Sequence, residues 1–88
     1  MDKEPDVTRV RVEICGENYY IKGSASEEYI KQLAKYVDEK MKLLSELNPR
    51  LSRINLAVLA ALNIADEYFK LKAEYEEFLE VFGEEKSK

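Results

Sequence analysis

"NLAVLAALNIADEY", residues 55–68, decides the fold of this chain, because residues 56–65 carry no charge and only one polar side chain, Asn63. A helix that spans a membrane needs about 20 consecutive apolar residues. This run is shorter, since Arg53 precedes it and Asp66 follows it. The chain opens with MDKEPD, which is acidic and has no apolar segment behind it, so we expect no signal peptide and no membrane insertion. The apolar run is therefore expected to be buried in protein.

The composition indicates one folded domain. Of the 88 residues, 45% are hydrophobic and 36% are charged, which is enough apolar content for a core. A chain of this size hides only about 60–65% of its unfolded surface, and such chains often gain core from a partner. The net charge is −4 and the Lys and Arg residues are interspersed with acids. We therefore expect no nucleic-acid partner, because a phosphate-binding face needs clustered cations.

Common catalytic and metal-binding patterns are missing from the sequence. With one cysteine, Cys15, and no histidine, the chain has no intrachain disulfide, no Cys/His dyad and no imidazole ligand. We expect a reducing cytoplasm and interpret Cys15 as a small apolar filler. The glycines at positions 16, 23 and 83 form no phosphate loop. No carboxylate lies on an apolar face where burial would raise its pKa. The sequence thus predicts no catalytic residue, no metal and no cofactor.

The first 22 residues predict a β-hairpin. Residues 9–15, RVRVEIC, alternate between an apolar face with Val10, Val12 and Ile14 and a polar face with Arg9, Arg11 and Glu13. Gly16-Glu17-Asn18 has turn chemistry, and residues 19–22, YYIK, form a second β-prone run.

An amphipathic helix is expected to cover this hairpin, because two strands alone are marginally stable. Ser24 or Ser26 can cap it, and acidic residues follow in the first turn. Its apolar stripe recurs at three- and four-residue steps: Ile30, Leu33, Ala34, Val37, Met41, Leu44 and Leu47. We interpret the opposite face as solvated: Lys31, Lys35, Asp38, Glu39, Lys42 and Glu46. Pro49 ends the helix.

A second helix should begin after Ser52, a plausible cap, and run from Arg53 to about Phe82, a stretch without Gly or Pro. At 1.5 Å per residue it would be about 45 Å long. A compact domain of 100 residues has a radius of gyration of only about 13 Å. The preceding residues therefore cannot cover the whole helix.

This long helix carries a coiled-coil seam. Alternating steps of four and three connect only apolar or aromatic residues: Ala57, Ala61, Ile64, Tyr68, Leu71, Tyr75, Phe78 and Phe82. A second row widens the apolar face before residue 70: Val58, Leu62, Ala65 and Phe69. We expect the first half to be enclosed by the hairpin, the first helix and a second chain, and the second half to project.

The expected fold class is α+β with the order ββαα, in which a hairpin packs on a helix and a long C-terminal helix forms an intermolecular coiled coil. The expected parts are a disordered N-terminus (1–7), a ββα head (8–52), a dimerisation helix (53–82) and a flexible tail (83–88). Asn63 is expected to form a hydrogen bond across the shared core and so to fix its register. Dimer or tetramer, and parallel or antiparallel pairing, remain open.

Five segments together resemble a known family: VEICG, YYIKG, YVDEKMKLL, NPRLS and NLAVLAALNIADEYFKLKAEYEE. In their order and spacing, residues 8–80 resemble the bacterial cell-division protein family ZapA, in the short form typical of Gram-positive bacteria. The resemblance implies a non-enzymatic cytoplasmic adaptor at the mid-cell division site. Such an adaptor binds FtsZ, the tubulin-like GTPase of the division ring, and cross-links or bundles its protofilaments.

The resemblance also implies oligomers. Proteins of this family form a homodimer through their long C-terminal helices, and dimers can pair into an antiparallel homotetramer. An oligomerisation role transfers to the positions inside the matching motif: Ala61, Leu62, Asn63, Ile64 and Tyr68.

The surface that would contact FtsZ transfers less directly. The charged surface of the head is implicated in family members, but the residue after the first-strand glycine, basic in some relatives, is Glu17 here. We expect contact through the polar strand face and the helix break: Arg9, Arg11, Glu13, Lys42, Arg50 and Arg53. These charges have an alternative interpretation as solubilising residues.

Two other functions remain open. A generic coiled-coil dimerisation module could regulate another protein or a nucleic acid. An enzyme would need a ligand-sized apolar pocket with carboxylates of perturbed pKa.

Overall fold

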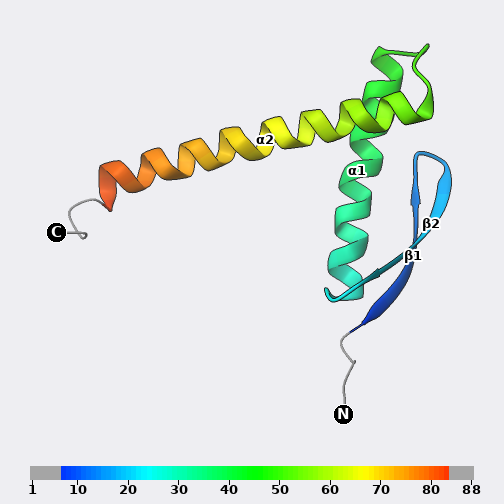
Figure 1. Cartoon of the computed structure of the whole chain (residues 1–88), viewed down its shortest axis with the longest axis horizontal. Helices are drawn as coiled ribbons and strands as arrows, with labels where there is room; N and C mark the ends of the chain where they lie inside the picture. Colours follow the sequence, from blue (N-terminus) through cyan, green and yellow to red (C-terminus); the bar gives the residue numbers. More distant parts are fainter. Residues whose placement is uncertain (1–6, 84–88) are drawn as a thin grey trace.

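The computed structural model describes residues 7–83 as two strands followed by two helices. An antiparallel hairpin of β1 (Thr8–Ile14) and β2 (Glu17–Gly23) lies along α1 (Glu27–Leu47). The long helix α2 (Arg53–Phe82) crosses one end of α1 and projects away from it (Figure 1). The predicted α+β class and ββαα order are confirmed. The predictions of a disordered N-terminus and a flexible tail fall almost wholly on residues 1–6 and 84–88, which lie outside the described residues.

The hairpin turn lies at Cys15-Gly16, so the prediction of a turn at residues 16–18 was wrong. Ile14 pairs with Glu17, which places Glu17 and Asn18 within β2. Cys15 and Gly16 have φ of 53° and 83°, which are the positive values that a type I′ turn requires at both central positions. The Cys15 N–H donates to Asp38 Oδ1 of α1 at 2.7 Å. This contact stabilises the left-handed conformation of Cys15, which is unfavourable for a residue that has a Cβ.

Two small clusters form the core. The first lies between β1 and α1 and contains Val10, Val12, Ile30 and Ala34. The second lies where α1 meets α2 and contains Met41, Leu44, Leu56 and Ala60. The predicted faces of β1 are confirmed, because Arg9, Arg11 and Glu13 are exposed opposite the buried valines.

Helix α1 begins after Ser26 and not after Ser24. The Ser26 hydroxyl accepts from the Tyr29 N–H at 3.1 Å, which satisfies one of the free donors of the first turn. The prediction of one buried stripe was wrong at Leu33 and Leu47, which are 48% and 68% exposed. Neither residue belongs to the two core clusters. Helix α1 forms the first cluster with β1 and meets α2 only in the second, near its C-terminal end.

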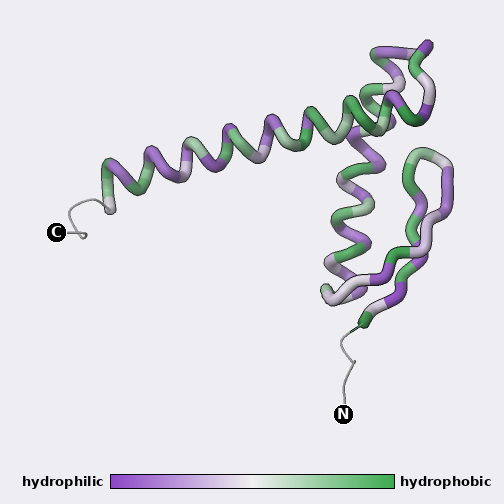
Figure 2. The backbone as a smooth tube through the Cα atoms, viewed as in Figure 1, coloured by the Kyte–Doolittle hydropathy of each residue, from purple (hydrophilic) through white to green (hydrophobic). Residues whose placement is uncertain are grey.

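Helix α2 begins after Ser52, whose hydroxyl accepts from the Asn55 N–H at 3.1 Å. In its first half, Leu56 and Ala60 are buried, but Val58 and Leu62 are 56% and 62% exposed. The hairpin and α1 therefore cover only part of this half, and its predicted enclosure by a second chain stays a prediction. The hairpin reaches this helix through its turn, where Ile14 and Cys15 pack against the second cluster. Hydrophobic residues recur along the whole of α2 (Figure 2). Many of their side chains are exposed in the single chain.

The molecule is elongated. Its Cα radius of gyration is 17.9 Å, whereas a compact chain of this length would have about 12 Å. Within residues 7–83, neither helix is long and apolar enough to span a membrane.

Candidate functional site

The seam predicted for oligomerisation lies along one side of α2 and is open to solvent. Asn63 and Ile64 are half-buried, and the other residues predicted for oligomerisation are exposed: Ala57, Ala61, Leu62, Tyr68, Leu71, Tyr75, Phe78 and Phe82. Near the C-terminal end, the Phe78 and Phe82 rings lie 4.8 Å apart between centroids. Contiguous apolar surface of this extent marks an interaction site. The seam therefore has the accessibility that an intermolecular coiled coil requires.

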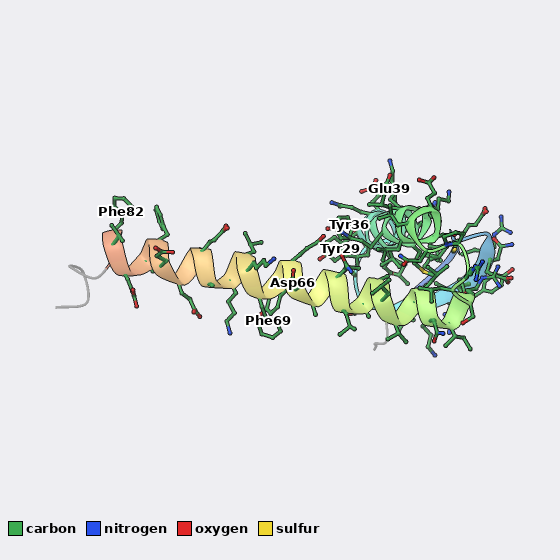
Figure 3. The ribbon with its side chains drawn as sticks, turned by 90° about the horizontal axis from the view of Figure 1, so that it is seen from above. Tyr29, Tyr36, Glu39, Asp66, Phe69 and Phe82 are labelled. Carbon is green, nitrogen blue, oxygen red and sulfur yellow. The ribbon has the colours of Figure 1, made fainter. Side chains whose placement is uncertain are left out.

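A second apolar row lies on the adjoining side of α2 and includes Leu62, which is predicted for oligomerisation but is not one of the seam positions. Its large side chains are exposed: Ile54, Val58, Leu62 and Phe69. Figure 3 shows Phe69 on the side of α2 that faces away from α1, whereas Tyr36 of α1 lies beside the first half of α2. The first half of α2 thus presents two apolar faces to solvent.

Asn63 is half-buried in the first half of α2. Its side-chain amide Nδ2 donates to the Leu59 carbonyl oxygen of the same helix at 3.2 Å. A hydrogen bond from Asn63 across a shared core stays a prediction.

A polar junction joins α1 to α2 where α2 leaves the head. The two carboxylate oxygens of Glu67 accept hydrogen bonds, Oε1 from the Tyr36 hydroxyl and Oε2 from the Lys40 ammonium group. The Lys40 side chain is only 15% exposed. Hydrogen bonds from Lys40 and then Tyr36 hold the pKa of Glu67 below its usual value. The same bonds to Glu67 raise the pKa of Lys40 and of Tyr36.

Sequence reasoning missed this junction, because Glu67 is 27 residues from Lys40 and 31 from Tyr36. The available signal was local: Tyr36 and Lys40 are one turn apart on the same edge of α1. Only the crossing of the two helices shows which carboxylate they share.

A second carboxylate, Asp38, ties α1 to the hairpin. Its side chain is 17% exposed, so its predicted place on a solvated face was wrong. The N–H of Cys15 lowers the pKa of Asp38, and Lys42, at 3.1 Å, lowers it further.

The six charged residues predicted to contact FtsZ fall into separate groups. Arg9, Arg11 and Glu13 share the outer face of β1. Lys42 pairs with Asp38 on α1, and Arg53 pairs with Glu17 of β2 at 3.4 Å. Arg50 is exposed in the loop between the helices. The six therefore come from β1, α1, the loop between the helices and the start of α2, and the charge of Glu13 on β1 acts on Lys42 of α1.

A groove of about 290 Å³ runs between β1 and α1 beside the first of these groups. Its polar lining comes from both elements: Arg11, Glu13, Lys31, Lys35 and Asp38. Sequence reasoning placed Lys31 and Lys35 on a merely solvated face, because the packing angle between β1 and α1 cannot be read from periodicity.

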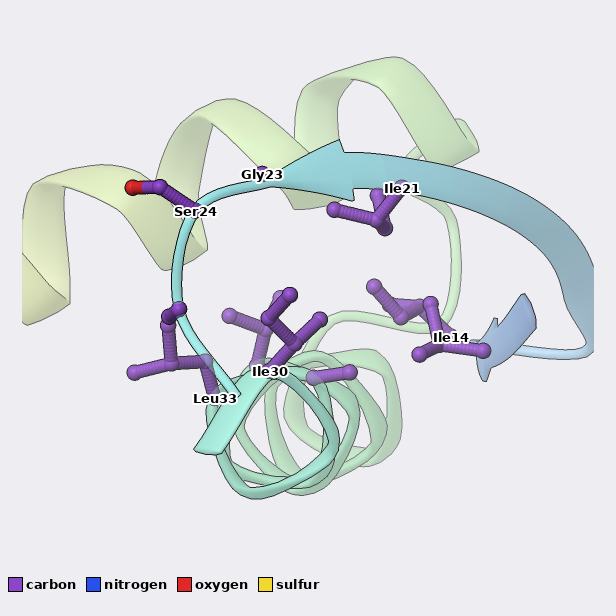
Figure 4. A pocket seen from close by; sticks show the side chains of 10 residues that line it. Ile14, Ile21, Gly23, Ser24, Ile30 and Leu33 are labelled. Atoms are coloured by element: carbon purple, nitrogen blue, oxygen red, sulfur yellow. The ribbon is translucent and has the colours of Figure 1, made fainter. Parts of the chain in front are cut away.

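An apolar cavity of about 380 Å³ lies between the hairpin and α1. It exists because α1 packs against β1 and leaves the inner side of β2 uncovered, with Ile21 above and Leu33 below (Figure 4). No acidic or basic side chain lines the cavity, and the perturbed carboxylates Asp38 and Glu67 lie outside it. Among residues 7–83, no cluster of three or more His, Cys, Asp or Glu side chains could hold a metal ion.

Comparison with known proteins identifies the family. The family described as "Cell division protein ZapA" matches residues 10–85. A cell division protein ZapA from Geobacillus sp. (strain WCH70) is 46% identical over 83 residues, which cover 94% of this chain and 95% of that protein. Another, from Geobacillus thermodenitrificans (strain NG80-2), is 51% identical over 76 residues, or 86% of this chain and 82% of the relative.

A solved structure shares the fold. It is a ZapA mutant dimer from Geobacillus stearothermophilus, which is 44% identical and superposes with a TM-score of 0.71 over 94% of this chain and 95% of that chain. Family match, sequence identity and fold agree over nearly the whole length, and the chain therefore belongs to the ZapA family of cell division proteins.

Proposed function

We propose that this chain is a non-enzymatic cell-division adaptor that binds FtsZ and cross-links its protofilaments, which stabilises the division ring. The observation that carries the proposal is the open apolar seam on a helix that projects beyond its own head. Family membership supports the role in division. The adaptor would act in the cytoplasm at the mid-cell division site.

The proposed mechanism is multivalency. Two copies pair through α2, so that each assembly carries two heads joined by helices of about 45 Å. When one head is bound, the second acts at a high effective concentration on a neighbouring filament, and weak contacts together give a firm link. The dimeric ZapA mutant of G. stearothermophilus supports pairing of this kind.

The two apolar faces of α2 support a further step in assembly. Val58 and Phe69 are exposed in the single chain, and a dimer that buried only the seam around Ile64 and Tyr68 would leave their row accessible. We propose that two dimers pair through remaining apolar surface into an antiparallel homotetramer. The hydrogen bond of Asn63 would then fix the register of the pairing.

The proposed docking surface for FtsZ is the charged surface of the head, including Arg9, Arg11, Glu13, Lys42, Arg50 and Arg53. Exposure of the strand charges supports a role in contact. Arg53 and Lys42 have intrachain partners and would also stabilise the head.

Sedimentation of FtsZ with GTP tests the proposal. Adding the chain should increase the amount of polymer in the pellet, and the increase should fall with salt, because exposed charges are screened. An unchanged pellet at every salt concentration would contradict the proposed function.

A further inference from the structure

We propose that the free edge of β1 is a docking strand for an extended acidic segment of a partner protein, which would add as a third strand along residues 9–13. Where the partner is FtsZ, the inference rests on the proposed function. Three features carry it: the direction of the backbone groups, the charges beside them, and a contact already present at one end of the edge.

The register shows which backbone groups face outward. Among residues 7–83 the sheet has two strands, so that β1 has an edge away from β2. The two-residue turn closes on the pair Ile14 and Glu17, and such a turn closes on a hydrogen-bonded pair. Because bonded and non-bonded positions alternate in an antiparallel ladder, the N–H and C=O groups of Arg9, Arg11 and Glu13 point away from β2. Outward groups of this kind are a template for strand addition.

The contact of Cys15 confirms this direction. Cys15 follows the same two-residue alternation, and its N–H points away from β2 to the Asp38 carboxylate at 2.7 Å. A carboxylate from α1 thus already occupies the end of the edge. Of the remaining positions, residues 11–13 line the groove of about 290 Å³ between β1 and α1.

The charges beside the edge favour an acidic segment. Arg11 from β1 and Lys31 and Lys35 from α1 line the groove, against Glu13 and Asp38. Asp38 already has Cys15 and Lys42 as partners, and Lys31 has an exposed ion pair with Glu27, with which an added carboxylate would compete. Arg9 lies further along the same edge and is exposed. Opposite charges across neighbouring strands stabilise the pairing, so Asp and Glu side chains of an added strand would face cations from two elements.

The edge of β2 as the docking site and a second copy of β1 as the occupant both fit less well. The free edge of β2 lies beside the apolar cavity, which has no charged lining. A second copy of β1 pairing antiparallel about its centre would place Arg11 opposite Arg11, and like charges directly opposite are destabilising.

Two substitutions at one position separate strand pairing from simple charge attraction. Glu13→Gln removes a negative charge from the groove and should tighten binding of FtsZ by about two- to fivefold. Glu13→Pro removes the same charge and also the outward N–H, and proline is tolerated at such an edge position because no ladder bond within the hairpin is lost. It should weaken binding by about tenfold or more, since pairing of the added strand is interrupted. Equal tightening by both variants would overturn the inference.

The cations have a matched control. Lys31 pairs with Glu27 at 2.9 Å and Lys70 pairs with Asp66 at 3.0 Å, both one helical turn apart. Lys31→Glu lies beside the edge and should weaken binding by about two- to fivefold. Lys70→Glu makes the same change on the projecting helix and should leave binding unchanged. Equal effects of the two substitutions would contradict a local role of the groove.

Amide hydrogen exchange keeps the test decisive if Glu13→Pro does not fold. In the unmodified chain, the amides of Arg9, Arg11 and Glu13 should exchange more slowly when FtsZ is added. Unchanged exchange in a chain that still pellets with FtsZ would refute the inference and leave the proposed function intact. Protection that rises with the concentration of the chain alone would instead assign the edge to a second copy. A chain that does not pellet with FtsZ would refute both proposals.

Discussion

Truncation of Phe78 is the sharpest test of the seam, because this residue lies on the projecting half of α2, far from the head. Its ring packs beside Phe82 of the same helix and is 55% exposed. Phe78→Ala removes the ring without disturbing the hairpin or α1, and alanine is the best helix former. Any loss of association therefore reports on the seam and not on folding of the head.

The magnitude follows from the exposed area. An aromatic side chain buries about 150–250 Å², so the exposed 55% of Phe78 amounts to about 80–140 Å². At about 25 cal/mol per Å², covering this area contributes about 2–3.5 kcal/mol for each chain, as an upper estimate. A dimer loses two such side chains, so even half of this value for each chain raises the dissociation constant by at least about thirtyfold.

Sedimentation equilibrium over a broad concentration range measures this change. The matched control is Glu77→Ala, which alters the neighbouring residue without removing apolar area from the seam. Circular dichroism of both variants checks that helix content is kept. A dissociation constant for Phe78→Ala equal to that of Glu77→Ala would show that the interface lies elsewhere on α2.

Three further predictions test other parts of the structure. Leu71→Glu places a charge on the seam and should weaken the oligomer and reduce bundling of FtsZ while the head stays folded; intact oligomers would show that the seam is misplaced. Glu67→Gln should lower the thermal stability of the head at neutral pH. Because the pKa of Glu67 is held below its usual value, its stabilisation is present above about pH 4.3, where the unfolded group ionises, and is lost as pH falls through the lower folded value. The two melting temperatures should therefore converge in acid, and a difference that stays constant down to pH 3 would contradict this role. Gly16→Ala should destabilise the fold by about 1–2 kcal/mol in urea unfolding, since φ is +83° and no atom lies within 4 Å of the added Cβ, so that backbone strain alone acts. Gly23→Ala, whose Cβ would make an ordinary 3.7 Å contact with Ile30, is the control, and equal stability of both variants would contradict the argument.

The elements of the fold could be predicted from the sequence because they depend on local patterns. Alternation placed Val10 and Val12 inside. The absence of Gly and Pro after Ser52 predicted a helix over the residues that α2 occupies. These signals act within a few residues and do not depend on how the elements cross.

What the sequence could not show depends on that crossing. The left-handed Cys15 is stabilised by Asp38, 23 residues away, and statistics of turn residues do not include such a contact. Likewise, the exposure of Leu33 depends on where α1 lies under the hairpin: the first core cluster joins α1 to β1, and Leu33 borders the apolar cavity below Ile21 of β2. The groove beside β1 has the same origin, since it joins Lys31 and Lys35 to Arg11 from a different element.

The central claim is that the chain cross-links filaments because its heads are joined through α2. It is tested most directly by comparing the unmodified chain with Phe78→Ala in two assays on FtsZ, binding to single filaments and light scattering by bundles. At concentrations where only the unmodified chain is dimeric, both should bind filaments, but only the unmodified chain should raise scattering. Equal bundling by Phe78→Ala, shown to be monomeric in the same buffer, would contradict the account.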